Sequence, residues 1–361
     1  MKKILMISGA RPNLVKLAPL YKFIQKKKKF KIKILHTNQH SDKFLYLNIC
    51  KNLEIKKPDY LLNKYYAKNN VYMISYFIRE ISNILEKFLP NLVILFGDVD
   101  TTLAAAIASS KRNFKIFHVE SGLRSNDFKM QEEINRRVTD HLADINFCPT
   151  QKSLENLKKE GLGEKSYLVG NIIFDNFLNL KKKIQKSSIL KKLLVRKDNY
   201  ILLTSHRYQI INYKINLRKL CKLINNLSEN IPLIFSCHSR TKKNLKKFNL
   251  LKTLNKNVKL INPLTYTDFA KLLINSKLIV TDSGGVHEEA FFHNKKCMVL
   301  RDVIEREDLI DSQNIFKINF KNYKQFFTKI FKNKIIKKKE IENWDGKVSQ
   351  RIYKILIKNA K

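Results

Sequence analysis

The chain of 361 residues, 44% of them hydrophobic, is long enough for two domains that each have a core. Its formal net charge of +40 would favour a nucleic-acid partner, but only 13 of the 71 basic residues are arginines, and the other 58 are lysines spread along the chain. We therefore expect no nucleic-acid partner. The sequence has no signal-peptide pattern or membrane-spanning run, so we expect no membrane partner either.

Cysteine usage bears on metal sites and on the redox compartment. The five cysteines are scattered and form no C-x-x-C pair: Cys50, Cys148, Cys221, Cys237 and Cys297. This pattern argues against zinc and for a reducing compartment, so we expect a cytoplasmic protein without a metal.

Predicted strands and helices alternate in two series. In the first series, strand-like runs at 3–7, 31–36, 92–96, 115–119 and 145–147 alternate with helical patterns at 14–27, 71–88, 101–112 and 131–142. After the lysine-rich stretch 181–197, further strands are predicted at 200–204, 232–236, 258–261, 278–281 and 297–300. The sequence thus predicts two doubly wound, Rossmann-like α/β domains with a central cleft, residues 1–175 and 176–344, and a helix within 345–361 that packs back on the first domain.

Glycine is scarce in this chain and concentrated after the predicted strands. Of only nine glycines, six follow strand-like runs: Gly9, Gly97, Gly122, Gly170, Gly284 and Gly285. Ligands bind at the carboxyl ends of the strands in open parallel sheets, so we expect the functional site at these turns.

Charged residues follow the first and third predicted strands. Arg11 and Lys16 lie at the start of a helix, where they suit phosphate oxygens, although a solvated helix start would look the same. Asp98 is a candidate catalytic carboxylate, whereas Asp100 or Thr101 can be explained as the cap of the next helix.

The densest group of charges surrounds the strand at 115–119. Glu120 follows that strand, and a carboxylate buried there is a candidate general acid or base. Glu132 and Glu133 open the next helix, and at least one of them should be structural because acids are favoured in a first helical turn. The spacing also predicts an ion pair between Glu133 and Arg137.

In the second half, the segment 276–290 predicts a strand, a turn and a helix. Ser283, Gly284 and Gly285 form the turn, where backbone N–H groups and the helix N-terminus can bind a diphosphate. Glu289, one turn further on, is placed to accept hydrogen bonds from a ribose. An ordinary tight turn whose glycines only permit packing is the alternative.

Other strand ends of the second half carry basic residues. His206 and Arg207 follow the strand at 200–204, and His238 and the segment Arg301 to Arg306 follow two further strands. We place these residues in the same functional region.

This ordered set of motifs resembles the non-hydrolysing UDP-N-acetylglucosamine 2-epimerase family, whose two-domain fold is similar to that of GT-B glycosyltransferases. The resemblance extends from about residue 4 to residue 310. Its motifs are Gly9-Ala-Arg-Pro, Gly97-Asp, His118-Val-Glu-Ser-Gly-Leu-Arg, Glu132-Glu-Ile-Asn-Arg, Val169-Gly-Asn, Ser205-His-Arg and Thr281-Asp-Ser-Gly-Gly-Val-His-Glu-Glu. Each motif is weak alone, but their order is specific.

The resemblance implies inversion at C2 of the sugar, by anti elimination of UDP to a 2-acetamidoglucal and re-addition of UDP. It implies that Asp98, Glu120, Glu132 and His206 are catalytic. Residues implied to bind the UDP-sugar are Arg11, Lys16, Arg136, Arg207, His238, Ser283, Gly284, Gly285, Glu289 and Arg306. No metal or cofactor is implied, a homodimer is common in the family, and the product would supply cell-surface polysaccharide synthesis.

Some residues depart from the family pattern. His287 stands where Gln is common, and Gln131 where Pro is usual. Asp100 and the loop Arg124-Ser-Asn-Asp127 are similar to members that act on modified UDP-2-acetamido sugars. Gln39 and His40 match a loop through which a second substrate molecule activates some bacterial members, but the residues that follow do not match.

Alternatives to the epimerase remain at this stage. They are a hydrolysing relative that releases UDP and N-acetylmannosamine, a UDP-sugar glycosyltransferase, a nucleic-acid binder and an inactive nucleotide-sugar sensor. The motifs around Glu120 and Glu132 favour the epimerase over the transferase, and the presence of every matched carboxylate argues against the inactive sensor.

Overall fold

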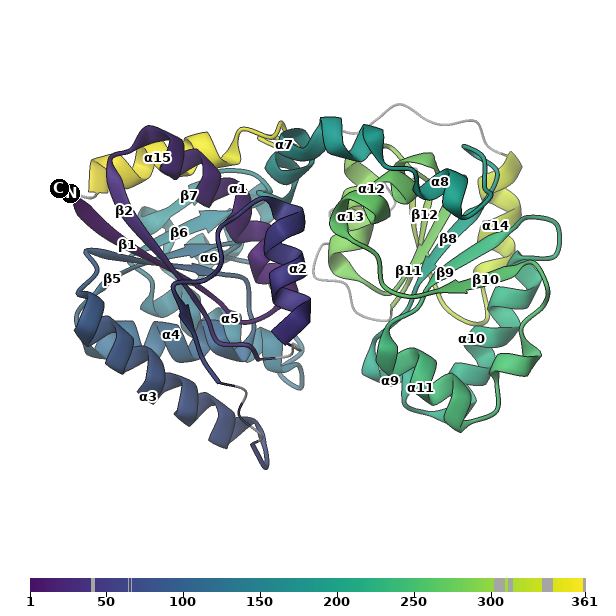
Figure 1. Ribbon diagram of the computed structural model, residues 1–361, viewed down its shortest axis with the longest axis horizontal. Coiled ribbons are helices and arrows are strands. Elements are labelled where there is room, and N and C mark those ends of the chain that lie inside the picture. Colours follow the sequence, from purple (N-terminus) through teal and green to yellow (C-terminus); the bar gives the residue numbers. More distant parts are fainter. Residues whose placement is uncertain are drawn as a thin grey trace. The chain divides into compact units, whose positions relative to one another are not determined.

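The computed structural model describes residues 1–39, 43–63, 65, 67–301, 309–310, 314–332 and 340–359, which form two compact units (Figure 1). The first unit comprises Met1–Leu180 and Glu340–Lys361, and the second comprises Lys181–Lys339. Among the described residues, no helix is long and apolar enough to span a membrane.

The first unit contains a parallel sheet in the order β3-β2-β1-β4-β5-β6-β7. Its strands are β1 (Lys2–Ser8), β2 (Phe30–His36), β3 (Tyr60–Leu61), β4 (Leu92–Phe96), β5 (Lys115–Val119), β6 (Ile145–Cys148) and β7 (Ser166–Leu168). Every residue of β4 is buried, as expected for a central strand covered by helices on both faces. The chain order reverses between β1 and β4, so the switch point of the sheet lies there.

Helices cover both faces of this sheet. They are α1 (Arg11–Lys27), α2 (Lys43–Leu53), α3 (Asn70–Phe88), α4 (Asp100–Lys111), α5 (Gln131–Leu142), α6 (Gln151–Lys159), α7 (Ile173–Lys186), which continues into the second unit, and α15 (Val348–Asn359). Figure 1 shows α3 and α4 on one face and α1 and α15 on the other. In α3, the residues Phe77, Ile81 and Leu85 recur every four positions and form a buried stripe against the sheet.

The chain returns to the first unit at its C-terminal end. Trp344 is buried and donates a hydrogen bond from Nε1 to the Pro149 carbonyl oxygen at 2.8 Å. Asp175 accepts hydrogen bonds from the backbone N–H groups of Val348 and Ser349 and so caps the start of α15. Tyr353 packs edge-on against Phe23 of α1, with ring centroids 5.5 Å apart. The C-terminal helix is therefore part of the first unit.

The second unit repeats the doubly wound arrangement with the sheet order β10-β9-β8-β11-β12-β13, all parallel. Its strands are β8 (Ile201–Thr204), β9 (Leu233–Ser236), β10 (Val258–Ile261), β11 (Leu278–Thr281), β12 (Cys297–Leu300) and β13 (Ile315–Ile318). Its helices are α8 (Ile189–Lys192), α9 (Tyr208–Ile211), α10 (Lys214–Leu227), α11 (Ser239–Lys247), α12 (Tyr266–Asn275), α13 (Gly284–Phe292) and α14 (Tyr323–Lys332). The switch point lies between β8 and β11.

The predicted fold class, two parallel α/β sheets, is confirmed. Each strand predicted from an apolar run is present, with ends within one or two residues of the prediction. The strands that the sequence analysis missed are β3, β7 and β13, and all three lie at the edge of a sheet. Two of them, β3 and β7, have only two and three residues, and the apolar run of β13 is interrupted by Lys317, so none of the three has the continuous apolar run that identifies a central strand.

His36 makes the stability of the first unit depend on pH. It ends β2, is fully buried, and has its Nδ1 3.0 Å from Ser8 Oγ. Burial lowers the pKa of His36 from 6.5 to about 4. The unfolded chain then binds a proton that the folded unit does not, so stability falls as the pH falls. Between pH 7 and pH 5 we expect His36 to cost the first unit about 2 kcal/mol.

This expectation can be tested by urea unfolding followed through Trp344, because the only tryptophan of the chain reports on the first unit. The free energies of unfolding at pH 7 and pH 5 are compared between the parent and His36→Gln. The variant should lose about 2 kcal/mol of the pH-dependent change. An identical change in both proteins would contradict the prediction.

Candidate active site

In the first unit, the carboxyl ends of β1, β4 and β5 are adjacent, and each is followed by a charged turn. Arg11 begins α1, and Lys16, one turn further on, is buried and forms an ion pair with Glu120. Glu120 follows β5 with φ +74°, a conformation that costs energy in a residue other than glycine and is typical of functional sites. The switch point thus brings Lys16 and Glu120 together across 104 positions of the sequence.

Asp98 lies in the turn after β4 and forms an ion pair with Arg136 of α5, at 2.5 Å from Nη2 to Oδ2. Asn135 donates a hydrogen bond to the Asp98 carbonyl oxygen at 2.9 Å and another to Asp100 Oδ1 at 3.0 Å. The other Asp100 oxygen accepts from Gln39 Nε2 at 3.0 Å. The turn that carries Asp98 is therefore tied to α5 and to the end of β2.

The expectation that Asp100 or Thr101 caps α4 is wrong. The N-cap residue is Val99, which makes no side-chain cap bond, and the backbone N–H of Thr101 in the first turn donates instead to Gln39 Oε1 at 3.1 Å. The Asp100 carboxylate instead accepts the two amide groups of Gln39 and Asn135, and the Thr101 hydroxyl donates to Gln39 Oε1 at 2.9 Å. Asp100 and Thr101 therefore connect the start of α4 to Gln39 and Asn135 and do not act as its N-cap.

The two glutamates at the start of α5 differ in environment. Glu133 is fully buried and accepts hydrogen bonds from Ser125 N at 2.8 Å and Ser125 Oγ at 3.0 Å. Its predicted ion pair with Arg137 is confirmed, at 2.8 Å. Burial alone would raise the pKa of Glu133, but these hydrogen bonds and the Arg136 charge lower it. Glu133 is structural, whereas Glu132 is exposed in the same turn.

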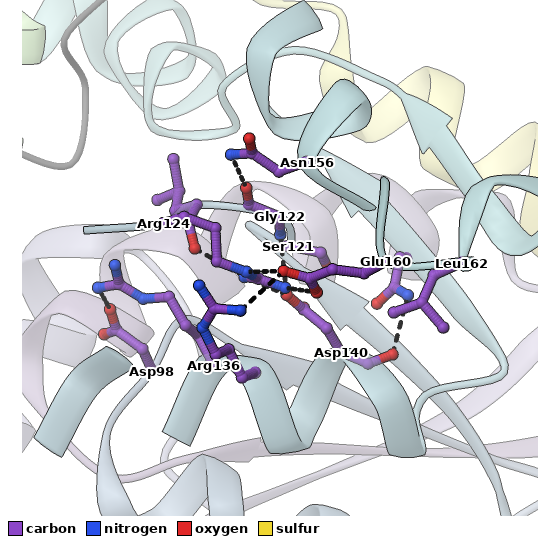
Figure 2. Close-up of polar contacts among 12 residues, drawn as sticks. Asp98, Ser121, Gly122, Arg124, Arg136, Asp140, Asn156, Glu160 and Leu162 are labelled. Atoms are coloured by element: carbon purple, nitrogen blue, oxygen red, sulfur yellow. Dashed lines mark hydrogen bonds and ion pairs between the residues drawn. The ribbon is translucent and has the colours of Figure 1, made fainter. Parts of the chain in front are cut away.

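A largely buried ionic network lies next to the turn after β5 and connects it to α5 (Figure 2). Arg124 donates to Asp140 Oδ2 at 2.7 Å and binds Glu160 through two nitrogens, at 2.8 and 2.7 Å. Asp140 also accepts from Gly122 N at 3.0 Å and lies 2.7 Å from His118 Nδ1. Sequence analysis assigned no role to Asp140 or Glu160. Since Asp140 follows Glu133 and Arg136 at seven and four positions, the helical spacing of α5 was a usable signal for Asp140.

Asn13 was also missed. Its Oδ1 accepts hydrogen bonds from the N–H groups of Gly9 and Ala10, at 3.2 and 2.9 Å, and its Nδ2 donates to the Phe96 carbonyl oxygen at 2.6 Å. Asn13 therefore fixes the turn after β1 to the end of β4.

In the second unit, Asp282 organises the turns after β8 and β11. This buried carboxylate accepts from Ser205 Oγ at 2.8 Å and from the N–H groups of His206 and Arg207 at 2.9 and 3.0 Å. The backbone carbonyl oxygen of Asp282 accepts a hydrogen bond from Arg207 Nε at 3.2 Å. His206 is about half exposed, and its ring lies 6.4 Å from that of His238. Asp282, which sequence analysis passed over, thus brings the predicted His206 and Arg207 to the switch point.

The predicted turn before α13 is present, with Ser283 as the N-cap and Gly284 and Gly285 as the first helical residues. Apart from its chain neighbours and the backbone of its own helix, no atom of the described residues lies within 4 Å of the place where a side chain of Gly285 would begin, so the helix N-terminus is open there. The buried Arg301 guanidinium lies beside Gly284. Glu289 lies one turn further on and is half-buried. The pKa of Tyr266 is raised, mainly because Tyr266 is buried and in addition because the negative charge of Glu289 is close. The open helix N-terminus and the Arg301 guanidinium suit an anion.

The candidate residues thus fall into two groups. Within the first unit the structure joins Lys16 to Glu120 and Asp98 to Arg136, and Arg11 and Glu132 lie at the starts of the same two helices, α1 and α5. Within the second unit it gathers the turn residues around Asp282, and Glu289 lies on the helix that follows. Arg306 and His40 lie outside the described residues. No cluster of His, Cys, Asp and Glu side chains suited to a metal occurs in the described part of the chain.

Two parallel sheets of Rossmann order, each with charged turns at its switch point, define an α/β enzyme of the GT-B-like class. The family model for UDP-N-acetylglucosamine 2-epimerase matches residues 22–357. The chain belongs to the UDP-N-acetylglucosamine 2-epimerase family, as its motifs indicated.

Individual relatives agree with this assignment. The chain is 41% identical to a UDP-N-acetylglucosamine 2-epimerase homolog of Methanococcus maripaludis, over 87% of this chain and 88% of the relative. It is 35% identical to the UDP-2,3-diacetamido-2,3-dideoxy-D-glucuronate 2-epimerase of Pseudomonas aeruginosa, over 85% of this chain and 86% of that relative. The crystal structure of the Methanocaldococcus jannaschii UDP-GlcNAc 2-epimerase in complex with UDP-GlcNAc and UDP matches with a TM-score of 0.89 and 35% identity. The match covers 99% of this chain and 100% of the chain in that structure.

Proposed function

We propose that this protein inverts C2 of UDP-N-acetylglucosamine, or of a closely related UDP-2-acetamido sugar, without hydrolysis. UDP leaves by anti elimination, which gives a 2-acetamidoglucal, and then adds back to yield the manno configuration. The observation that carries the proposal is the pairing of two carboxylates with cations at one switch point: Asp98 with Arg136, and Glu120 with Lys16.

These pairs suit the two halves of an elimination. A carboxylate must remove the proton from C2, and an acid must return a proton on the opposite face when UDP adds back. Asp98, Glu120 and Glu132 are the carboxylates for these steps, and the assignment of base and acid is open among the three. The neighbouring cations Arg11 and Lys16, together with His206, would stabilise the negative charge that develops on departing UDP.

The second unit would hold the nucleotide. The open N-terminus of α13 offers the N–H groups of Gly284 and Gly285 to the diphosphate, and Ser283 and Arg207 add donors beside it. Glu289 would accept hydrogen bonds from the ribose hydroxyls. His238, Arg136 and Arg306 complete the proposed UDP-sugar site. We further propose a cytoplasmic homodimer whose product feeds polysaccharide synthesis.

The deciding experiment is proton and phosphorus NMR of the protein with UDP-N-acetylglucosamine in D₂O. Non-hydrolysing epimerisation gives UDP-N-acetylmannosamine with deuterium at C2 and the nucleotide still attached. Accumulation of free UDP and free N-acetylmannosamine would instead establish the hydrolysing reaction. If UDP-N-acetylglucosamine is unchanged, the modified sugar named for the Pseudomonas aeruginosa relative is the next substrate to test.

Glu289→Ala is expected to weaken the affinity for UDP by about tenfold, because one bidentate hydrogen bond between a carboxylate and the ribose is lost. Isothermal titration calorimetry with UDP measures the change. Glu229→Ala removes an equal charge from the exposed connection before β9, at the amino ends of the strands, and should leave the affinity unchanged. Equal affinities in the two variants would remove Glu289 from the ribose site.

A further inference from the structure

His118 is a fully buried residue of β5 whose ring meets two hydrogen-bond acceptors. Its Nδ1 lies 2.7 Å from Asp140 Oδ1, and its Nε2 lies 2.8 Å from the carbonyl oxygen of Gly97. A carbonyl oxygen can only accept, so Nε2 must carry a proton.

The other nitrogen also faces an acceptor, because Asp140 is ionised. The second Asp140 oxygen already accepts from Arg124 Nη1 at 2.7 Å and from Gly122 N at 3.0 Å. A carboxylate in these bonds has no proton to give, so Nδ1 must donate as well.

We propose that His118 donates a hydrogen bond from each ring nitrogen, as an imidazolium, and thereby positions the two turns that carry Asp98 and Glu120. A neutral imidazole has a single N–H and would place a lone pair against one of the two acceptors at less than 3 Å, in a fully buried site. That arrangement costs more than charging the ring beside a carboxylate. Both contacts are made only when both nitrogens donate.

The imidazolium connects the turns after two neighbouring strands. Gly97, held through its carbonyl oxygen, has φ +65° and directly precedes Asp98. Gly122, held by Asp140, has φ +80° and follows Glu120 by two positions. Ser121 Oγ bonds back to the His118 carbonyl oxygen at 2.8 Å. The pair His118–Asp140 thus fixes both turns from the side away from solvent.

His118 is a positioning residue, since its ring is inaccessible and cannot exchange a proton with a substrate. This role rests on the proposed function, because it matters for turnover only if Asp98 and Glu120 react. The protonation of the ring, in contrast, follows from the contacts alone and can be tested without any substrate.

The first test is long-range proton–nitrogen NMR of the full chain with ¹⁵N-labelled histidines at pH 8.0. One of the eight histidines should show two N–H nitrogens, and this signal should be missing from the spectrum of His118→Gln. A His118 ring with one bare nitrogen would overturn the proposal. If no histidine of the parent protein shows two N–H nitrogens, the proposal is overturned whether or not the variant folds.

The second test is kinetic. In the His118→Gln variant, both N–H bonds of the glutamine amide are on one nitrogen. The side chain therefore cannot donate to Asp140 and to the Gly97 carbonyl oxygen at the same time, as the two ring nitrogens do. We expect kcat to fall about 10- to 100-fold while KM and UDP affinity change less than about threefold. His141→Gln alters an exposed histidine of α5 and should leave kcat within about twofold of the parent.

The two possible failures are distinguishable. A parent protein that converts no UDP-2-acetamido sugar contradicts the proposed function, while the NMR result still decides the charge of His118. If the parent protein is active and the His118→Gln variant has the same kcat, the positioning role is contradicted.

Discussion

Asp98→Asn is expected to lower kcat at least about 1,000-fold while UDP affinity changes less than about threefold. The amide keeps the shape of the side chain and can still contact Arg136, but it cannot accept a proton from C2 of the sugar. In the structure Asp98 is partly accessible and is held at 2.5 Å from Arg136, so the variant should retain the turn and lose the reactive group.

The measurement is the initial rate of epimerisation by NMR together with calorimetric titration of UDP. Asp144→Asn provides the control, because this exposed aspartate lies before β6, at the amino ends of the strands, and bonds to Ile116 N at 2.7 Å. Full activity of Asp98→Asn would exclude Asp98 from the chemistry. Loss of both activity and UDP binding would instead indicate a damaged site.

Asp140→Ala is expected to destabilise the first unit by about 3 to 5 kcal/mol. Asp140 is fully buried and joins His118 and Arg124, so its removal leaves the buried His118 ring without a carboxylate and Arg124 paired with Glu160 alone. The pKa of Asp140 is lowered, so its contribution is present at neutral pH and is lost as the pH falls below the usual range of aspartate.

Urea unfolding followed by Trp344 fluorescence at pH 7 measures this loss in the first unit. Asp144→Ala removes an aspartate four positions further on, whose carboxylate bonds to the backbone N–H of Ile116, and it should cost about 1 kcal/mol. An Asp140→Ala variant within about 1 kcal/mol of the parent would show that the network contributes little to stability.

Part of this protein is readable from local sequence. The strand Leu92–Phe96 is apolar at every position because both faces are covered, and such runs identified the central strands of both sheets. The Glu133–Arg137 pair follows from the helical repeat, and Gly284 and Gly285 identify a strand-to-helix turn. In these cases the partners are a few positions apart, so spacing alone determines which side chains meet.

Other features needed the tertiary structure. The cap assigned to Asp100 was wrong because Gln39, 61 positions earlier, competes for its carboxylate. Asp282 binds the Ser205 turn across 77 positions, and neither residue carries a local signal for the other. Edge strands such as β3 were missed because their pairing depends on a neighbouring strand rather than on their own residues.

The fold class, the family and the turns where charged residues gather can be predicted from the chain's residues, because they depend on local periodicity and on the order of motifs. Which carboxylate meets which cation depends on how the elements pack in three dimensions. Lys16 reaches Glu120, and Arg136 reaches Asp98, because β1, β4 and β5 are adjacent in the sheet although separated in the chain. Strand order is set by the packing of whole elements, so no single segment encodes it.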